Sequence, residues 1–241
     1  MSGPEIISLI SSKVKAVSLD GTRPTVCISG GIDSTIVLHH VIHDLMGGNS
    51  SRVYTVTALF GNGDERDKAR RVAEHYRTSH SEVVISRDEF FSMLPVVLRY
   101  YPFPRYNLWT WVLLKHLACS HLFIGEGGDE IFGYGDRSFL EGWAGQLVWV
   151  HPAWKVACDY YGINLHAPFS EIQSDWYPVI TYYSPPAKVV LREAYTGVIP
   201  DFVIGQSSTP PSIGFYNMVG MSKEELQIEA AKIWLKVRNI S

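Results

Sequence analysis

Apolar residues in the first half of the chain recur at two different spacings. Residues 5–17 have helical spacing, and the short apolar run at 25–28 is typical of a buried strand. A second helical pattern follows at 32–45, and the β-branched run at 53–60 predicts another strand. Further expected elements are helices at 64–76, 88–99 and 106–118 and strands at 82–85 and 121–124. This alternation of strands and helices predicts a parallel sheet with crossover helices.

The second half of the chain has a different pattern. Residues 138–161 are rich in aromatic side chains and are expected to be helical, with an interruption at Pro152. Stretches that contain several prolines, at 176–186 and 200–216, predict loops. Residues 222–225, Ser-Lys-Glu-Glu, have the capping-box pattern and predict the start of a C-terminal helix.

Together these patterns predict an α/β fold, with a parallel twisted sheet, flanking helices and a helical C-terminal half. The chain contains no internal repeat and no low-complexity tract, and no stretch has the composition of a flexible linker. We therefore expect a single domain over residues 1–241, with its core at about 22–135 and the helical part at about 136–241.

Composition and charge exclude several classes of protein. The 241 residues are 46% apolar and 19% charged, which is typical of a globular protein and not of a disordered one. The net charge of −3 argues against a broadly basic nucleic-acid binder. Cys27, Cys119 and Cys158 form no C-x-x-C pair, and such scattered cysteines fit a reducing compartment. Without a signal-peptide pattern or a bilayer-length apolar run, we expect a cytoplasmic protein that does not enter membranes.

The first candidate for chemistry is the sequence Ser-Gly-Gly-Ile-Asp-Ser-Thr at residues 29–35, which we call the first loop. It lies between a predicted strand and a predicted helix, so its backbone N–H groups would point into one concavity at the positive end of the helix. Two glycines allow a tight turn, and the hydroxyls of Ser29, Ser34 and Thr35 add donors, which suits a phosphate or pyrophosphate. Asp33 would repel that anion unless a cation lay between them, and this predicts Mg²⁺. The alternative is an ordinary Gly-Gly turn with a helix cap.

The second candidate is the sequence Gly-Glu-Gly-Gly-Asp-Glu at residues 125–130, which we call the acidic loop. It also follows a predicted strand, and ligands of parallel sheets bind at the carboxyl ends of the strands. Asp129 and Asp33 would then face the same Mg²⁺ from opposite sides. The alternative for this segment is a solvated acidic turn.

Both loops carry a family resemblance. Residues 29–34 are similar to the signature of the PP-loop ATP pyrophosphatases, which have an adenine nucleotide alpha hydrolase-like fold. Residues 125–134 resemble the second signature of the synthetase domain of asparagine synthetases, which β-lactam synthetases share. Weaker matches, which extend the resemblance over roughly residues 22–216, are Ala69, Ala73, His75, 161–169 and 188–200.

The resemblance implies a reaction and a set of site residues. ATP would be cleaved between its α- and β-phosphates, a carboxylate or amide oxygen would be adenylated, and ammonia or an amine would displace AMP. Asp33 and Asp129 would hold Mg²⁺, and Glu126 would face the acyl substrate. The residues implied at the pyrophosphate are Ser29, Gly30, Gly31 and Ser34, and those implied to line the adenosine are Ile28, Leu59, Phe60 and Gly125.

The sequence departs from the family at several points. It begins with Met-Ser and has only about twenty residues before the predicted core, so no glutaminase domain is expected. The family's downstream lysine has no counterpart near Ser208, and Lys188, in the family's Lys-x-x-Leu-Arg-Glu segment, is the candidate catalytic substitute. The acidic residue expected before the proline loop at 100–103 is absent. The many tryptophans are either core residues or the walls of a pocket for a larger, flatter substrate.

Three other functions remain open at this point. A nucleotide-binding or regulatory subunit with impaired catalysis would explain the missing lysine. A PP-loop tRNA-modifying enzyme would be expected to show a basic surface or a placed cysteine pair, and an NAD synthetase shares the first loop but not the acidic loop. The expected partners are a small-molecule carboxylate with ammonia or an amine, and a separate glutaminase, another subunit or a homodimer is left open. The histidines lack ligand spacing and are expected at the surface or satisfied in the core.

Overall fold

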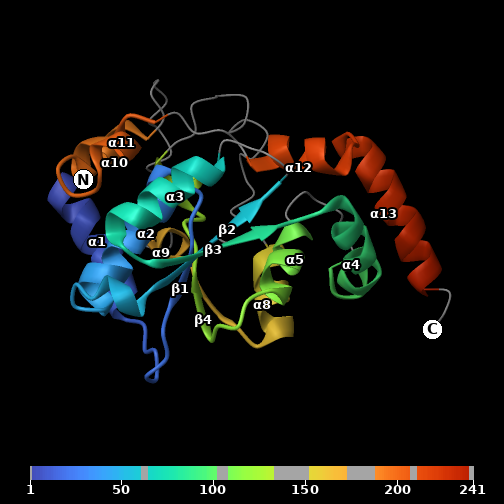
Figure 1. Ribbon diagram of the computed structural model, residues 1–241, viewed down its shortest axis with the longest axis horizontal. Coiled ribbons are helices and arrows are strands. Elements are labelled where there is room, and N and C mark those ends of the chain that lie inside the picture. Colours follow the sequence, from blue (N-terminus) through green and yellow to red (C-terminus); the bar gives the residue numbers. More distant parts are fainter. Residues whose placement is uncertain are drawn as a thin grey trace.

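The fold is built around a parallel sheet. The computed structural model describes residues 2–60, 65–101, 108–132, 152–172, 188–206 and 211–238. Within these residues the sheet has five strands in the order β3-β2-β1-β4-β5, and every neighbouring pair is parallel (Figure 1). The strands are β1 (Thr25–Cys27), β2 (Tyr54–Leu59), β3 (Ser79–Val84), β4 (His121–Phe123) and β5 (Asn164–His166).

Helices cover both faces of the sheet (Figure 1). On one side lie α1 (Gly3–Lys15), α2 (Ile32–His40), α3 (Glu65–Tyr76), α9 (Pro168–Ile172), α10 (Val189–Tyr195) and α11 (Asp201–Ile204). On the other lie α4 (Arg87–Tyr100), α5 (Trp109–Lys115), α8 (Pro152–Tyr161), α12 (Pro211–Val219) and α13 (Lys223–Arg238). Helix α6 (Gly128–Phe132) follows β4, a π-helical turn (Val41–Leu45) extends α2, and a 3-10 turn (Ser50–Arg52) precedes β2.

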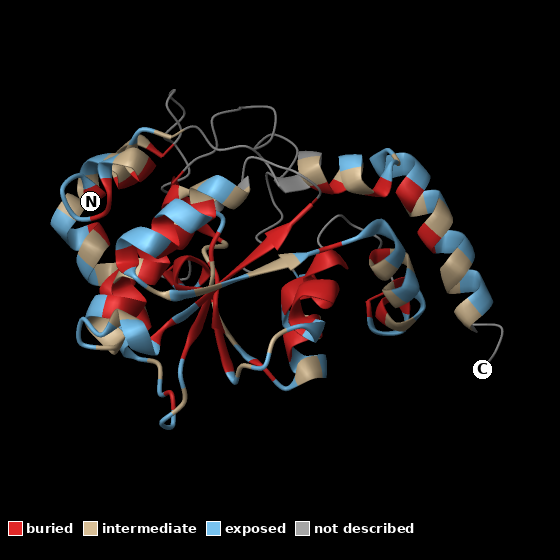
Figure 2. Cartoon of the chain, viewed as in Figure 1, coloured by how far each residue is buried: buried red, intermediate tan, exposed pale blue. Residues whose placement is uncertain are grey.

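Each face of the sheet has its own hydrophobic core, because successive strand residues point in opposite directions. Leu122 packs into the cluster that contains α4, α5 and α8, whereas its neighbour Phe123 packs into the cluster that contains α1, α2 and α10. Figure 2 shows the buried residues concentrated on the central strands and on the helix faces turned toward them. The edge strand β3 is much more exposed.

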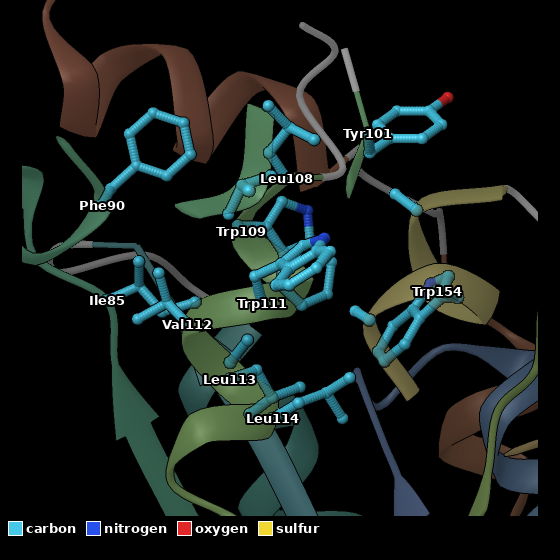
Figure 3. Packing of buried hydrophobic residues seen from close by; sticks show 14 of the residues in the cluster. Ile85, Phe90, Tyr101, Leu108, Trp109, Trp111, Val112, Leu113, Leu114 and Trp154 are labelled. Carbon is cyan, nitrogen blue, oxygen red and sulfur yellow. The ribbon is translucent and has the colours of Figure 1, made fainter. Parts of the chain in front are cut away.

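The described tryptophans near α5 are core residues. The exposed fractions of Trp109, Trp111 and Trp154 are 8%, 0% and 5%, and Figure 3 shows them packed among Leu108, Leu113 and other apolar side chains. This settles the alternative between core and pocket wall for these three residues in favour of the core. Trp143, Trp149 and Trp176 lie outside the described residues.

The predicted fold class is confirmed, with differences in the second half. The stretch 200–216 is not a loop, as the prolines suggested, because it contains α11 and α12. Pro200 directly precedes α11 and Pro211 begins α12, and proline is well tolerated at the start of a helix, where the missing N–H costs no hydrogen bond. Helix α8 begins at Pro152, the point at which the aromatic-rich stretch 138–161 was expected to be interrupted.

Other elements were not expected or cannot be compared. Strand β5 and the short helix α9 were not predicted at all. The capping box is confirmed, since the Glu225 carboxylate accepts from the Ser222 backbone N–H at 2.8 Å. All of 138–151 and all of 176–186 lie outside the described residues. No helix in the described part of the chain is long and apolar enough to cross a membrane.

Candidate active site

The first loop leaves the carboxyl end of β1 and leads directly into α2. Inside the sheet the Thr57 hydroxyl donates to the Ile28 carbonyl at 2.6 Å, which holds the strand end in place. In the loop itself, the Ser29 backbone N–H donates to the Ser34 hydroxyl at 3.2 Å. The Thr35 hydroxyl is buried and donates to the Gly31 carbonyl at 2.8 Å, so in this structure Thr35 stabilises the loop.

Helix α3 packs closely on this loop. Gly30 has φ = +77°, and a Cβ there would lie 2.5 Å from the carbonyl carbon of Lys68. A larger residue would therefore be strained by its backbone conformation and would also collide with α3. The glycine that the sequence suggested for a tight turn is thus also needed for the contact between the loop and the neighbouring helix.

The acidic loop lies against the first loop. A Cβ at Gly125 would lie 2.6 Å from the backbone nitrogen of Ser34, and one at Gly128 would lie 2.6 Å from Oδ1 of Asp33. β1 and β4, which carry the two loops, are neighbours in the sheet. The two loops therefore meet at the carboxyl ends of adjacent strands, as the sequence predicted.

Lys188 brings a positive charge between the two loops. Its ammonium group contacts Oδ2 of Asp33 and lies 2.7 Å from Oδ1 of Asp129. Only 4% of the lysine side chain is exposed. Its backbone is left-handed, with φ = +62° at the residue before α10, which is uncommon for a side chain of this size. Such a conformation persists where the surrounding contacts hold it, as the two carboxylates do here.

The three charges perturb one another. Burial raises the pKa of Asp33 to about 6 and outweighs the opposing effect of Lys188, while the nearby Asp129 raises it further. Burial alone would lower the pKa of Lys188, but the charges of Asp33 and Asp129 outweigh it and hold that pKa above its usual range. The lysine is therefore a stable cation between two carboxyl groups, of which the more deeply buried resists ionisation.

The residues at this point fit a magnesium ion. Oδ1 of Asp33 is buried and has no hydrogen-bond partner in the described part of the chain. Asp33 and Asp129 already converge on one cationic group, and carboxylate oxygens are the ligands that Mg²⁺ prefers. No group of three or more metal-ligating side chains occurs among the described residues. Mg²⁺ needs no such group, since it is commonly held by one or two carboxylates together with phosphate oxygens and water.

The other predicted site residues lie around this centre. Glu126 is half-buried on the acidic loop, and its backbone carbonyl accepts from the Ser170 hydroxyl at 3.1 Å. Leu59 ends β2, Phe60 follows it, and both are buried; the Phe60 ring packs edge to face against Trp109 at a centroid distance of 5.4 Å. Residues 61–64 and 207–210, including Ser208, lie outside the described residues. The roles of these residues stay predictions.

Lys188 was a candidate catalytic residue, but its contacts in the site were missed by sequence reasoning. Nothing in the local sequence indicated that Lys188 would reach Asp33, 155 positions earlier in the chain. The α10 helix that begins after Lys188 is also held by Arg192, whose guanidinium donates to the carbonyls of Ile204 and Gln206. The available signal was the resemblance of this segment to a family motif, which gave Lys188 a place without showing its contacts.

Comparison with known proteins gives a family. The family model described as asparagine synthase matches residues 6–172. No curated protein matches the sequence. Three solved structures are similar to this chain, each with a TM-score below 0.5.

The first of these is a U34-tRNA thiolase, NcsA, from Methanococcus maripaludis, with 14% identity and a TM-score of 0.46 over 99% of this chain and 81% of that one. The second is an NH3-dependent NAD synthetase from Campylobacter jejuni, with 13% identity and a TM-score of 0.44 over 98% and 93%. The third is a predicted subunit of a tRNA methyltransferase from Methanocaldococcus jannaschii, with 16% identity and a TM-score of 0.42 over 85% and 91%.

Proposed function

Because the chain belongs to the asparagine synthase family, we propose that it is an ATP-dependent ligase that joins a small-molecule carboxylate to ammonia or an amine and releases AMP and pyrophosphate. The observation that carries this proposal is the convergence of Asp33 and Asp129 on one cationic point at the ends of adjacent parallel strands. Two loops that are far apart in the sequence supply these two carboxylates. Such an arrangement suits the Mg²⁺ complex of a nucleoside triphosphate.

The chain's own groups would act on the phosphates. The first loop presents backbone N–H groups and the hydroxyls of Ser29 and Ser34 at the N-terminus of α2, where an anion is stabilised. Asp33 and Asp129 would hold Mg²⁺, which when bound neutralises charge on the phosphates. Lys188 would place a second positive charge beside the departing pyrophosphate and so take over the role of the family lysine that is missing near Ser208.

The proposed reaction has two steps. A carboxylate oxygen of the substrate attacks the α-phosphorus of ATP, the bond from that phosphorus to the bridging oxygen breaks, and pyrophosphate leaves. The nitrogen of ammonia or an amine then attacks the acyl carbon, the bond to the AMP oxygen breaks, and the nitrogen loses one proton. Glu126 would face the acyl substrate from the acidic loop. The ammonia comes from solution or from a separate glutaminase subunit.

A second candidate function follows from the missing lysine. The segment 205–211 contains no lysine, and Lys188 is tied to two carboxylates in this structure. If Lys188, in that ion pair, does not compensate for the missing lysine, the chain would be a nucleotide-binding subunit without catalysis. This function predicts ATP binding without AMP formation.

Exchange of labelled pyrophosphate into ATP distinguishes the two functions. The assay would contain Mg²⁺ and a panel of carboxylic acids, and AMP would be measured after ammonium is added. We expect exchange with at least one acid, and its loss in Asp33→Asn and Asp129→Asn. Asp159→Asn is the matched control, because Asp159 is an exposed aspartate on α8, outside the site. Exchange that is unchanged in both site variants would contradict the assignment of the metal, and ATP binding without any exchange would favour the binding subunit.

A further inference from the structure

Helices α2 and α10 are joined by two pairs of side chains. The first pair is Asp33 and Lys188, and the second is His40 and Tyr195, whose ring Nε2 and hydroxyl oxygen lie 2.7 Å apart. Asp33 and His40 are seven positions apart, and so are Lys188 and Tyr195. Seven residues make about two helical turns and span about 10 Å, so the two helices run in parallel with one link near each end.

The second link has a defined direction. Nδ1 of His40 lies 2.5 Å from Oδ2 of Asp44, one turn further along the chain. Burial lowers the pKa of His40, so its ring is neutral and carries one N–H. A carboxylate only accepts, so that N–H is on Nδ1 and donates to Asp44, which leaves Nε2 to accept from the Tyr195 hydroxyl. Burial also raises the pKa of Tyr195, which keeps its hydroxyl protonated as the donor.

Both side chains of the second link are buried. His40 and Tyr195 are 2% and 0% exposed, and both helices pack on α1. A shift of α10 by one residue along its axis would move it by about 1.5 Å and rotate its side chains by about 100°, which would break both links at once. The left-handed backbone of Lys188 makes such a shift still less favourable, because that conformation needs contacts that hold it.

We infer that the hydrogen bond from Tyr195 to His40, braced by Asp44, fixes the register of α10 on α2 and thereby holds the Lys188 ammonium between the two site carboxylates. His40 and Tyr195 are positioning residues, since they contact neither the loops nor the phosphate site and act through Lys188. The inference deepens the proposed function and rests on it for its catalytic consequence only. The placement of Lys188 itself is tested without any activity.

The test compares two tyrosines. Tyr195→Phe removes the hydroxyl of the link. Tyr76→Phe is the matched control, because the Tyr76 hydroxyl also lies near a histidine of α2, His39, at 3.4 Å, but comes from α3. The readout is the rate at which an amine-reactive acetylating reagent modifies Lys188, measured by peptide mass spectrometry. The buried thiol of Cys158, in the other core, reports global opening through its alkylation rate in the same sample.

We expect Tyr195→Phe to raise the Lys188 acetylation rate about tenfold, as expected for the loss of one buried hydrogen bond, and Tyr76→Phe to leave it unchanged. Cys158 alkylation should stay at the wild-type rate in both variants. An unchanged Lys188 rate in Tyr195→Phe, or an equal rise in both variants, would overturn the inference. If faster alkylation of Cys158 shows that the Tyr195→Phe variant opens globally, the variants His40→Gln and His40→Leu test the inference instead. Glutamine keeps an acceptor for Tyr195, so its Lys188 rate should stay closer to wild type than that of the leucine variant, and equal rates would overturn the inference.

A second readout connects the link to catalysis. If the wild-type protein exchanges pyrophosphate, Tyr195→Phe should lower kcat for exchange while the KM for the acid stays within about twofold, and Tyr76→Phe should change neither. Absence of exchange in the wild type would refute the proposed function alone, since the acetylation result still decides the inference. Exchange in the wild type with no effect of Tyr195→Phe on either readout would refute the inference alone.

Discussion

Replacing Lys188 by methionine removes the cation between the two site carboxylates and keeps most of the side-chain volume. In the native cluster one positive charge faces two carboxyl groups. After Lys188→Met, two like charges face each other, with 17% of the Asp33 side chain and 36% of the Asp129 side chain exposed. We therefore expect the variant to be less stable than the wild type and to respond more strongly to added cations.

The size of the effect follows from the burial. Removing one partner of a buried ion pair costs about 3–5 kcal/mol. Asp129 is more than a third exposed, so solvent screens its share, and Asp33 can take up a proton. The expected loss in the free energy of unfolding is therefore about 2–3 kcal/mol, somewhat below the range for a fully buried pair.

Urea unfolding at neutral pH measures this loss. Lys155→Met is the matched control, because Lys155 is an exposed lysine on α8. The double variant Lys188→Met/Asp33→Asn removes one negative charge as well and should recover at least about 1 kcal/mol of the loss. A loss in Lys188→Met no larger than in the control would refute the electrostatic reasoning, and so would a double variant that is less stable than Lys188→Met alone.

Three further predictions concern other parts of the fold. Thr57→Val leaves the buried Ile28 carbonyl without its donor and should lower the free energy of unfolding by about 1–3 kcal/mol in urea titrations, whereas a loss below 0.5 would mean that the strand end is held otherwise. Gly128→Ala should abolish pyrophosphate exchange, because the new Cβ would meet the Asp33 carboxylate. Gly205→Ala, whose new Cβ would have no contact nearer than 3.8 Å among the described residues, should keep wild-type exchange, and an active Gly128→Ala would contradict the close contact of the loops. Burial lowers the pKa of His166 to about 4, so between the ordinary histidine pKa and about 4 the unfolded chain binds a proton that the folded chain does not. The free energy of unfolding should therefore fall as the pH falls through that window. His166→Gln should make this dependence on pH weaker, and an equally steep dependence in the variant would contradict the prediction.

The first half of the site could be predicted from the sequence because each loop directly follows a strand. Short apolar runs ended at Gly30 and at Gly125, and a parallel sheet places the ends of its strands along one edge. That rule places Asp33 and Asp129 along the same edge without knowledge of any contact. The two meet because β1 and β4 are neighbours in the sheet, which the structure shows.

The second half of the site could not be predicted, because it depends on packing between distant segments. Lys188 and Tyr195 each meet a partner 155 positions earlier, and no local pattern specifies such pairing. Strand β5 has only three residues, too few for an alternation of polar and apolar residues to identify a strand. Helices α11 and α12 were hidden by prolines at their starts, where proline does not break a helix.

We propose that Asp33 and Asp129 together hold one divalent cation with a bound nucleotide. Electron paramagnetic resonance of Mn²⁺, used as a substitute for Mg²⁺, tests it directly in the presence of an ATP analogue that cannot be cleaved between its α- and β-phosphates. We expect one tightly bound Mn²⁺ per chain in the wild type and in Asp159→Asn, and its loss in Asp33→Asn and in Asp129→Asn. Binding of Mn²⁺ that is equally tight in all four proteins, or nucleotide binding that does not depend on any divalent cation, would show that these two aspartates are not the metal ligands.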